Sequence, residues 1–285
     1  MPDPVNNEDE MLNRTLLTQG DFVLKEPIDL TNCDKEPIHI PGMIQPHGVL
    51  LAVTMGDAPT IVQCSRNTVE LLGRPVEQLL GKPLAELLGD QQLPALQMQD
   101  IIRMATSDLQ YLDLTISVAG EECSFTGIVH ESEGLLILEL ELVYSETVAA
   151  GNDFDWIRVF FSRIKFARNR TEASQVVAEQ VKEMLGYDRV MIYEFDEEWN
   201  GKVIAEAKEQ HLEPFLGHHY PASDIPKQAR ALYLRNWLRI IVDVSYRPVE
   251  IVPMVQPLTG KPLNLSLSVL RSNPRCILNI CTTWV

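Results

Sequence analysis

Two short stretches of the sequence carry residue types that folding alone does not require. The first, residues 32–48, reads NCDKEPIHIPGMIQPHG and places Cys33 just before two X-Pro steps. Because such steps favour extended backbone, the thiol is expected on a stiff arm. The second, residues 217–233, reads GHHYPASDIPKQARALY and sets Asp224 in a loop that two prolines restrict. A thiol on an arm and a rigid polar loop far along the chain indicate a ligand that is held by one part of the protein and reached by another.

Each of these features also has a structural interpretation. Free cysteines are commonly buried, but the polar neighbours of Cys33 argue against burial. Asp224 also suits an acidic residue that complements the dipole of the helix predicted to follow it, and from the residues alone this interpretation is favoured. His218 and His219 are adjacent and no third ligand accompanies them, so no metal site is predicted.

The composition is that of a globular protein with about two domains. Of the 285 residues 45% are apolar and 22% are charged, and 24 basic against 40 acidic residues leave a net charge of -16. That charge repels a phosphate backbone, so no nucleic-acid partner is expected, and the basic stretch 163–170 is interpreted as a solvated helix face. No apolar run of about 18 residues occurs, which predicts no membrane span.

The five cysteines show no metal-binding spacing. Cys64 and Cys123 fall in strand patterns and are interpreted as core thiols. The N-terminus is acidic and polar, unlike a secretory signal, and together with the cysteine usage this favours a reducing cytoplasmic location.

Hydrophobic periodicity predicts two α+β units. Residues 1–22 are polar and acidic and are predicted to be disordered. The first unit, residues 23–145, combines a strand–turn–strand, short helices and a three-strand meander, which is typical of a PAS domain. Its predicted strands cover 47–53, 60–65, 112–118, 124–131 and 135–144, and its helical spacing covers 67–88.

The second unit, residues 152–285, follows the order of a GAF domain. Gly186 predicts the end of its second helix, and Asn200-Gly201 predicts a hairpin turn. A Pro- and Gly-rich stretch, residues 245–269, follows the last predicted strand. The predicted helices cover 154–166, 173–185 and 226–236, and the predicted strands cover 189–196, 201–209 and 238–244.

With these elements in order, the two motifs resemble the bacteriophytochrome family, the phytochromes that attach biliverdin through an N-terminal cysteine. The resemblance extends from about Cys33 to Arg271. It implies an α+β fold in which a PAS domain precedes an incomplete GAF domain, each an antiparallel sheet with flanking helices. It also implies a knot, in which the N-terminal arm passes through a lasso formed by residues 245–269.

The resemblance implies a red/far-red photoreceptor that signals by isomerising covalently bound biliverdin, and not an enzyme. For a longer parent protein it implies a homodimer, a PHY domain, a histidine kinase output and a response regulator.

The resemblance further implies a role for each pocket residue. Cys33 would form a thioether with the A-ring vinyl group, and the main-chain carbonyl of Asp224 would accept from the pyrrole nitrogens. Arg239 and Arg271 match positions that clamp the two propionates, for which a guanidinium fork is well suited. The other matching positions contact the rings or a propionate: Tyr193, Tyr220, Tyr233, Met191 and Ile225. As ordinary core or surface residues these need no functional explanation.

The sequence departs from the family pattern after Arg271. Family members continue with Ser-Pro-x-His and a helix ending in Asn-Met-Gly, whereas this chain reads SNPRCILNICTTWV. Suitable codons for RCILNICTTWV, read in a shifted frame, encode Met-His-Ile-Glu-Tyr-Leu-His-Asn-Met-Gly. We therefore expect an out-of-frame tail from about residue 273 and a GAF domain without its closing strands.

Two other functions stay open at this stage. One is a degenerate PAS–GAF fragment that pairs with a partner and holds no chromophore. The other is a GAF domain for cyclic nucleotides, in which the arm around Cys33 would have no role. An enzyme is not predicted, because no nucleophile–base pair or metal cluster is evident.

Overall fold

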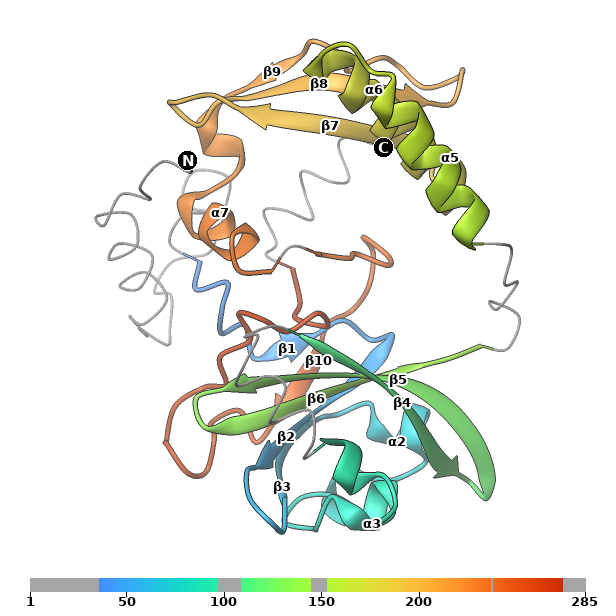
Figure 1. The fold of residues 1–285 in the computed structure, drawn as a ribbon. Coiled ribbons are helices and arrows are strands. Elements are labelled where there is room, and N and C mark those ends of the chain that lie inside the picture. The colour runs from blue at the N-terminus through green and yellow to red at the C-terminus, as the bar shows by residue number, and fades with distance from the viewer. Residues whose placement is uncertain (1–35, 97–108, 145–152, 237, 274–285) are drawn as a thin grey trace. The chain divides into compact units, whose positions relative to one another are not determined.

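The computed structural model describes residues 36–96, 109–144, 153–236 and 238–273, and the chain divides into two compact units (Figure 1). One unit comprises residues 1–147 together with 227–285, and the other comprises residues 148–226. Residues 227–273 thus belong to the same compact unit as the N-terminal part of the chain.

The first unit is built on a seven-stranded antiparallel sheet in the order β1-β10-β3-β2-β6-β5-β4. Five of these strands confirm the predicted ones to within three residues at each end. The strands are β1 (Met43–Ile44), β2 (Gly48–Thr54), β3 (Ile61–Ser65), β4 (Gln110–Val118), β5 (Glu121–Ser132), β6 (Leu135–Leu142) and β10 (Val249–Val252). The helices of this unit are α2 (Thr68–Leu72), η2 (Val76–Gln78), α3 (Ala85–Leu88) and α7 (Lys227–Tyr233).

The inner strands of this sheet are buried on both faces, whereas side chains of the edge strand β4 alternate between buried and exposed. Along β2, Val49, Leu51 and Val53 join a core with α2, η2 and α3. The alternate residues Leu50 and Ala52 join a second core on the other face. Since successive side chains of a strand point to opposite faces, a strand covered on both sides reads as a continuous apolar run, as β2 does. The second core is completed by residues from the far end of the chain, Leu263, Leu265 and Leu270.

The segment that carries β1 lies between two parts of this C-terminal stretch. On one side β1 pairs with β10, and Ile251 N–H donates to Gly42 O at 2.9 Å. On the other side Leu265 N–H donates to His39 O at 2.7 Å. Gln45 N–H also donates to Leu270 O at 2.7 Å. The backbone groups of this arm are therefore satisfied by residues that follow about 200 positions later.

The strand predicted at 238–244 is wrong, because no strand forms there and the strand of this stretch is β10. The backbone of 238–244 finds a side chain in place of a neighbouring strand. The Gln45 amide donates from Nε2 to Ile240 O at 2.8 Å and accepts at Oε1 from Val242 N–H at 3.3 Å. One glutamine side chain therefore satisfies two backbone groups of this segment without a neighbouring strand.

The second unit has a three-stranded antiparallel sheet, β7-β8-β9, and two helices. The helices α5 (Asp153–Lys165) and α6 (Arg170–Leu185) confirm the prediction, as does the hairpin β7 (Arg189–Phe195) and β8 (Gly201–Lys208). At the N-terminus of α6 the Asn169 side chain accepts from Glu172 N–H at 2.9 Å, and at its C-terminus Gly186 adopts φ 68°. The short β9 (His219–Tyr220) and the turn η4 (Ala222–Asp224) follow.

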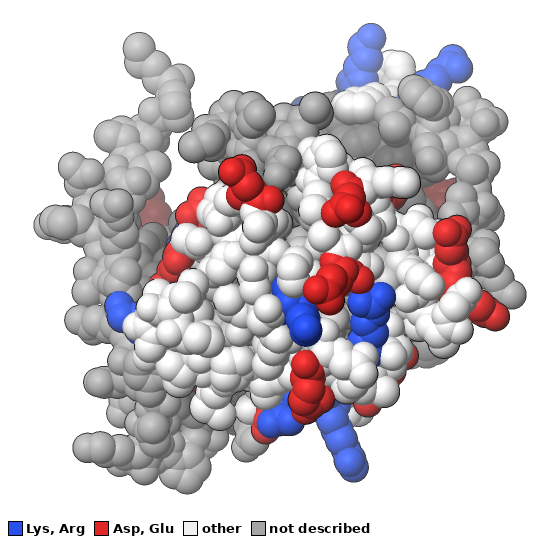
Figure 2. Space-filling model, turned by 90° about the horizontal axis from the view of Figure 1, so that it is seen from below, with Lys and Arg blue, Asp and Glu red and all other residues white. Residues whose placement is uncertain are grey.

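Charged side chains are sparse on the face of the first unit that carries β3, α2 and α3. Figure 2 shows this face from below, with acidic and basic side chains interspersed on a largely uncharged surface. Elsewhere in the unit, an exposed ion pair joins residues far apart in the sequence, with Arg66 Nε 2.8 Å from Glu250 Oε2.

Gly48 should be intolerant of a side chain, because the C-terminal segment packs directly on it. A Cβ at this position would lie 2.7 Å from Leu270 Cδ1 and 2.8 Å from Leu140 O. We expect Gly48→Ala to lower the free energy of unfolding by about 1–3 kcal/mol, the usual range for overpacking, as measured by urea denaturation. In a Leu270→Ala background the cost should be smaller, and an equal cost in both backgrounds would contradict the packing.

Candidate functional site

The structure describes eight of the nine predicted site residues, and Cys33 lies outside the described residues. The eight fall on both compact units. Met191, Tyr193, Tyr220, Asp224 and Ile225 belong to the second unit, and Tyr233, Arg239 and Arg271 belong to the first.

In the second unit, two of the predicted tyrosines meet across the sheet. Tyr193 on β7 and Tyr220 on β9 have ring centroids 5.9 Å apart. The strand between them, β8, presents Gly201 at this point, and a Cβ on Gly201 would lie only 1.8 Å from the Tyr193 ring. The rings therefore lie over bare backbone, which explains why a glycine occupies a position where a strand usually prefers a side chain.

Asp224 adds a negative charge to this pair of rings. The turn that carries Asp224 is closed by its own N–H, which donates to Pro221 O at 3.1 Å. Burial raises the pKa of Tyr193, and the neighbouring Asp224 carboxylate raises it further. Burial likewise raises the pKa of Tyr220, with a further contribution from Asp224 that the positive charge of Arg189 opposes. The structure thus brings together three of the residues predicted for the pocket.

The other two predicted residues of this unit are half-buried neighbours of the trio. Met191 lies on β7 opposite Glu206, and Ile225 directly follows η4.

A buried ion pair holds the loop that leads to Tyr220. The Glu206 carboxylate pairs with Arg189 and accepts from Phe215 N–H at 2.9 Å and from Leu216 N–H at 3.0 Å. The Arg189 guanidinium lies 4.0 Å from the centre of the Phe215 ring. This pair was not predicted from the sequence, although a glutamate among the apolar residues of VIAEA was a usable signal.

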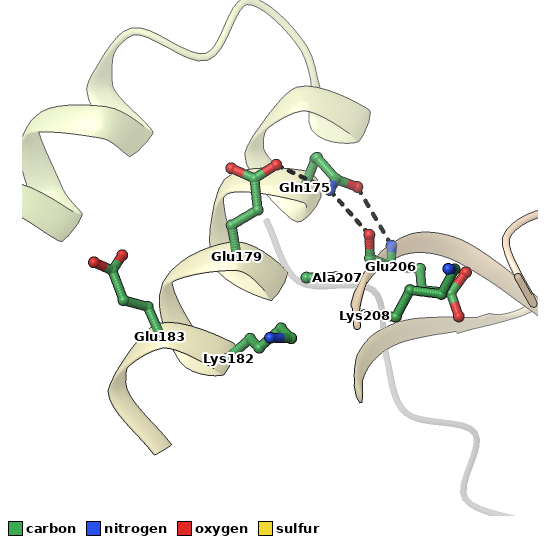
Figure 3. Close-up of a pocket in the computed structure, with 7 residues that line it drawn as sticks. All are labelled: Gln175, Glu179, Lys182, Glu183, Glu206, Ala207 and Lys208. Carbon is green, nitrogen blue, oxygen red and sulfur yellow. Dashed lines mark hydrogen bonds between the residues drawn. The ribbon is translucent and has the colours of Figure 1, made fainter. Parts of the chain in front are cut away.

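A polar hollow of about 540 Å³ lies between α6 and β8, and Glu206 also lines it (Figure 3). Gln175 on α6 reaches the backbone of β8 there, accepting from Glu206 N–H at 3.3 Å and donating to Glu206 O at 3.0 Å. Its amide completes the hydrogen bonds of β8 at a point that β9 does not reach. None of the eight described site residues lines this hollow.

In the first unit, the two predicted arginines are held by backbone carbonyls. Arg239 donates to Ser268 O at 3.1 Å and Val269 O at 2.9 Å, and also to Arg271 O and the Asn273 side chain. Arg271 is buried and donates to Ile38 O. Burial lowers the pKa of Arg239 to about 10. Burial and, to a lesser extent, the nearby Arg239 charge lower the pKa of Arg271 to about 9.

One N–H donor of these two arginines has no hydrogen-bond acceptor among the described residues. Arg271 Nε is buried and finds no acceptor among the described residues. Tyr233, the third predicted residue of this unit, is 43% exposed, and its phenol raises the pKa values of both arginines slightly.

A buried carboxylate faces the same segment from the sheet. Glu139 on β6 is fully buried and accepts from Ser268 Oγ at 2.6 Å, Val269 N–H at 3.0 Å and Leu270 N–H at 2.6 Å. Burial raises its pKa to about 7, and the three donors and the Arg239 charge oppose that shift. No role was predicted for Glu139, because a glutamate in LLILELEL fits ordinary strand alternation.

Two further properties concern only the described part of the chain. Its His, Cys, Asp and Glu side chains form no group of three or more that could hold a metal ion. None of its helices combines the length and the apolar character needed to cross a membrane.

A family model described as a PAS fold matches residues 33–143. Over 89% of its length the chain is 49% identical to cyanobacterial phytochrome B of Nostoc sp., of which it covers 34%. Over 86% of its length it is 42% identical to a bacteriophytochrome of Xanthomonas campestris, of which it covers 38%. The chain therefore spans about a third of the length of these curated relatives.

Solved structures give the same result. The chromophore-binding domain of Stigmatella aurantiaca phytochrome P1 is 42% identical with a TM-score of 0.78, covering 88% of this chain and 82% of that one. The chromophore-binding domain of an unusual bacteriophytochrome from R. palustris is 37% identical with a TM-score of 0.78, covering 88% of this chain and 81% of that one. The prediction of an α+β fold with a PAS domain and a second antiparallel sheet is confirmed.

Removing the Arg189 side chain should destabilise the loop before Tyr220 and make it open more often. Arg189→Ala leaves the Glu206 carboxylate buried without its cation, and breaking such a pair costs roughly 3–5 kcal/mol. We expect the amide hydrogens of Phe215 and Leu216, whose acceptor is Glu206, to exchange much faster. The matched control is Arg170→Ala, which removes an exposed ion pair with Glu194 and should cost less than about 1 kcal/mol. Equal losses in the two variants would show that Glu206 does not depend on Arg189.

Proposed function

Because the chain belongs to the bacteriophytochrome family, we propose that it is the biliverdin-binding part of a red/far-red photoreceptor. In this proposal residues 152–285 belong to a GAF domain. The arm before β1 passes through the lasso 245–269, and the bonds that satisfy its backbone from two sides support that topology. Biliverdin is attached as a thioether to Cys33.

The observation that carries the proposal is that a buried arginine, Arg271, has an N–H donor without a hydrogen-bond acceptor among the described residues. A bilin has two propionates, and a carboxylate that enters a partly dry site needs a charged partner. Arg271 Nε has no acceptor among the described residues, and burial already lowers the pKa of this side chain, so a bound carboxylate would relieve both. A guanidinium fork would hold such a group with two parallel hydrogen bonds.

The remaining residues would orient the ring system. Tyr193 and Tyr220 would line the D-ring, Tyr233 would face a propionate, and Met191 and Ile225 would pack on the rings. The main-chain carbonyl of Asp224 would accept from the pyrrole nitrogens. Bound biliverdin would supply light absorption and a double bond that isomerises.

Because the chain spans only about a third of the length of its curated relatives, we propose that the whole protein is a dimeric signalling protein. It would add a PHY domain, a histidine kinase output and a response regulator partner, act in the cytoplasm and bind no nucleic acid. In this chain the only covalent chemistry would be the attachment of its own chromophore.

A second function is favoured by the contacts of Arg239. Its hydrogen bonds go to protein groups at residues 268–273, so its role is also compatible with a PAS–GAF fragment that pairs with a partner and holds no bilin. Mixing the chain with biliverdin separates the two, because only the photoreceptor module develops a red absorption band.

Covalent attachment should depend on Cys33 alone. Cys33→Ser should abolish the zinc-fluorescent band that survives denaturing electrophoresis, because a hydroxyl is a far weaker nucleophile than a thiol. The non-covalent absorption should remain.

Cys123→Ser and Cys276→Ser are the matched controls and should keep the band. Cys64 is not expected to react, because burial raises the pKa of its thiol to about 12 and leaves little of the nucleophilic thiolate. A band that survives Cys33→Ser and disappears with Cys276→Ser would reassign the attachment site. No absorption change in the unaltered chain would favour the fragment without chromophore.

A further inference from the structure

We propose that Glu139 is a positioning residue of the bilin site, which holds the segment 268–271 and through it the two arginines. This inference rests on the proposed function for its ligand. Its structural part lies entirely within the first unit, where the sheet and the arginine-bearing segment pack together.

The segment is held from two sides by opposite charges. The Glu139 carboxylate accepts from the N–H groups of Val269 and Leu270, whereas the Arg239 guanidinium donates to the carbonyls of Ser268 and Val269. An anion at the N–H ends and a cation at the C=O ends both stabilise the same orientation of these peptide dipoles. The two charged groups are thus coupled through the peptide groups between them.

The adjoining contacts carry this orientation to Arg271. The Leu270 side chain packs against the backbone of Gly48, and the Leu270 carbonyl accepts from Gln45 N–H at 2.7 Å. A rotation of the Leu270 backbone would therefore break its contacts with the segment that carries β1. Arg271 forms an isolated antiparallel β-bridge with Ile44, and its backbone carbonyl accepts a hydrogen bond from the Arg239 guanidinium. A shift of the Glu139 donors would therefore move both guanidinium groups.

Glutamine is the sharpest replacement for Glu139, because it keeps the size and loses an acceptor. Both carboxylate oxygens accept hydrogen bonds here: Oε1 from Val269 N–H, and Oε2 from Ser268 Oγ and Leu270 N–H. A glutamine NH2 cannot accept, so at least one buried N–H would face another donor. Leaving a buried donor unsatisfied is costly whether or not a ligand is present.

The charged and titratable groups around Glu139 fix the sign of the pH dependence. His130 Nδ1 on β5 lies 3.7 Å from Oε1, and the charges of Arg239 and Arg271 act from the C-terminal segment. The pKa of Glu139 is raised from 4.5 to about 7, so the docked segment binds a proton that the opened segment releases. The docked state is therefore most stable below the lower value and loses stability as the pH rises to about 7.

The test combines amide exchange with ligand affinity in the 285-residue chain. Exchange of the Val269 and Leu270 amides, corrected for intrinsic rates, is followed from pH 5 to pH 8, and biliverdin affinity is measured by absorption titration. The variants are Glu139→Gln and, as a matched control on the same strand, Glu141→Gln. Glu141 is partly exposed and lies beside His47 Nε2 at 3.3 Å.

We expect Glu139→Gln at pH 8, where Glu139 is a carboxylate, to speed exchange at both amides and to weaken biliverdin binding, each about tenfold or more. It should also abolish the fall in protection between pH 5 and pH 7 that the unaltered chain shows. Glu141→Gln should change none of these.

Unchanged exchange in Glu139→Gln, with normal biliverdin binding by the unaltered chain, would overturn this inference alone. Faster exchange with unchanged affinity would overturn the positioning role. If the unaltered chain bound no biliverdin, the proposed function would fall and the positioning role with it, while the exchange data would still decide whether Glu139 anchors the segment.

Discussion

The peptide groups of residues 268–271 lie between the Glu139 carboxylate and the Arg239 guanidinium, and the first unit depends on that arrangement. A carboxylate in the middle of an apolar sheet is strongly unfavourable unless donors surround it. Here the donors come from residues about 130 positions later in the chain. The sheet therefore cannot bury its second face favourably until the C-terminal segment has docked.

The same segment closes the core and carries the proposed ligand contacts. Leu263, Leu265 and Leu270 complete the second core, and Arg271 follows directly. Local pairs such as β4–β5 and β5–β6 need only short loops, whereas β1 and β10 join the sheet through contacts of large sequence separation. The segment that completes the second core also carries the proposed ligand contacts. A substitution that loosens its packing is therefore expected to alter ligand binding, even where the substituted residue does not contact the ligand.

Local signals allowed much of the fold to be predicted from the sequence. The Asn200-Gly201 turn and the apolar stripe that ends at Gly186 each depend on residues close in sequence, and both predictions are confirmed. The strand predicted at 238–244 failed because its backbone partner is a glutamine side chain almost 200 residues away, which no local pattern reveals. Glu139 was missed for the same reason, since its donors are distant while its neighbours resemble those of any strand. The pocket residues came from the family resemblance, and their type and spacing alone would have left Asp224 as a helix-terminal acid.

The two arginines of the first unit differ in what they can still bind. A guanidinium has five N–H groups, and Arg239 already serves four acceptors within residues 268–273. Arg271 by contrast keeps its Nε without an acceptor among the described residues. A carboxylate that reached this region could use Arg271 at once, whereas recruiting Arg239 would take donors away from the carbonyls that keep the segment in place. In the proposed site the pair would therefore divide the work: Arg271 would bind the ligand directly, and Arg239, together with Glu139, would hold the segment in the orientation that makes this possible.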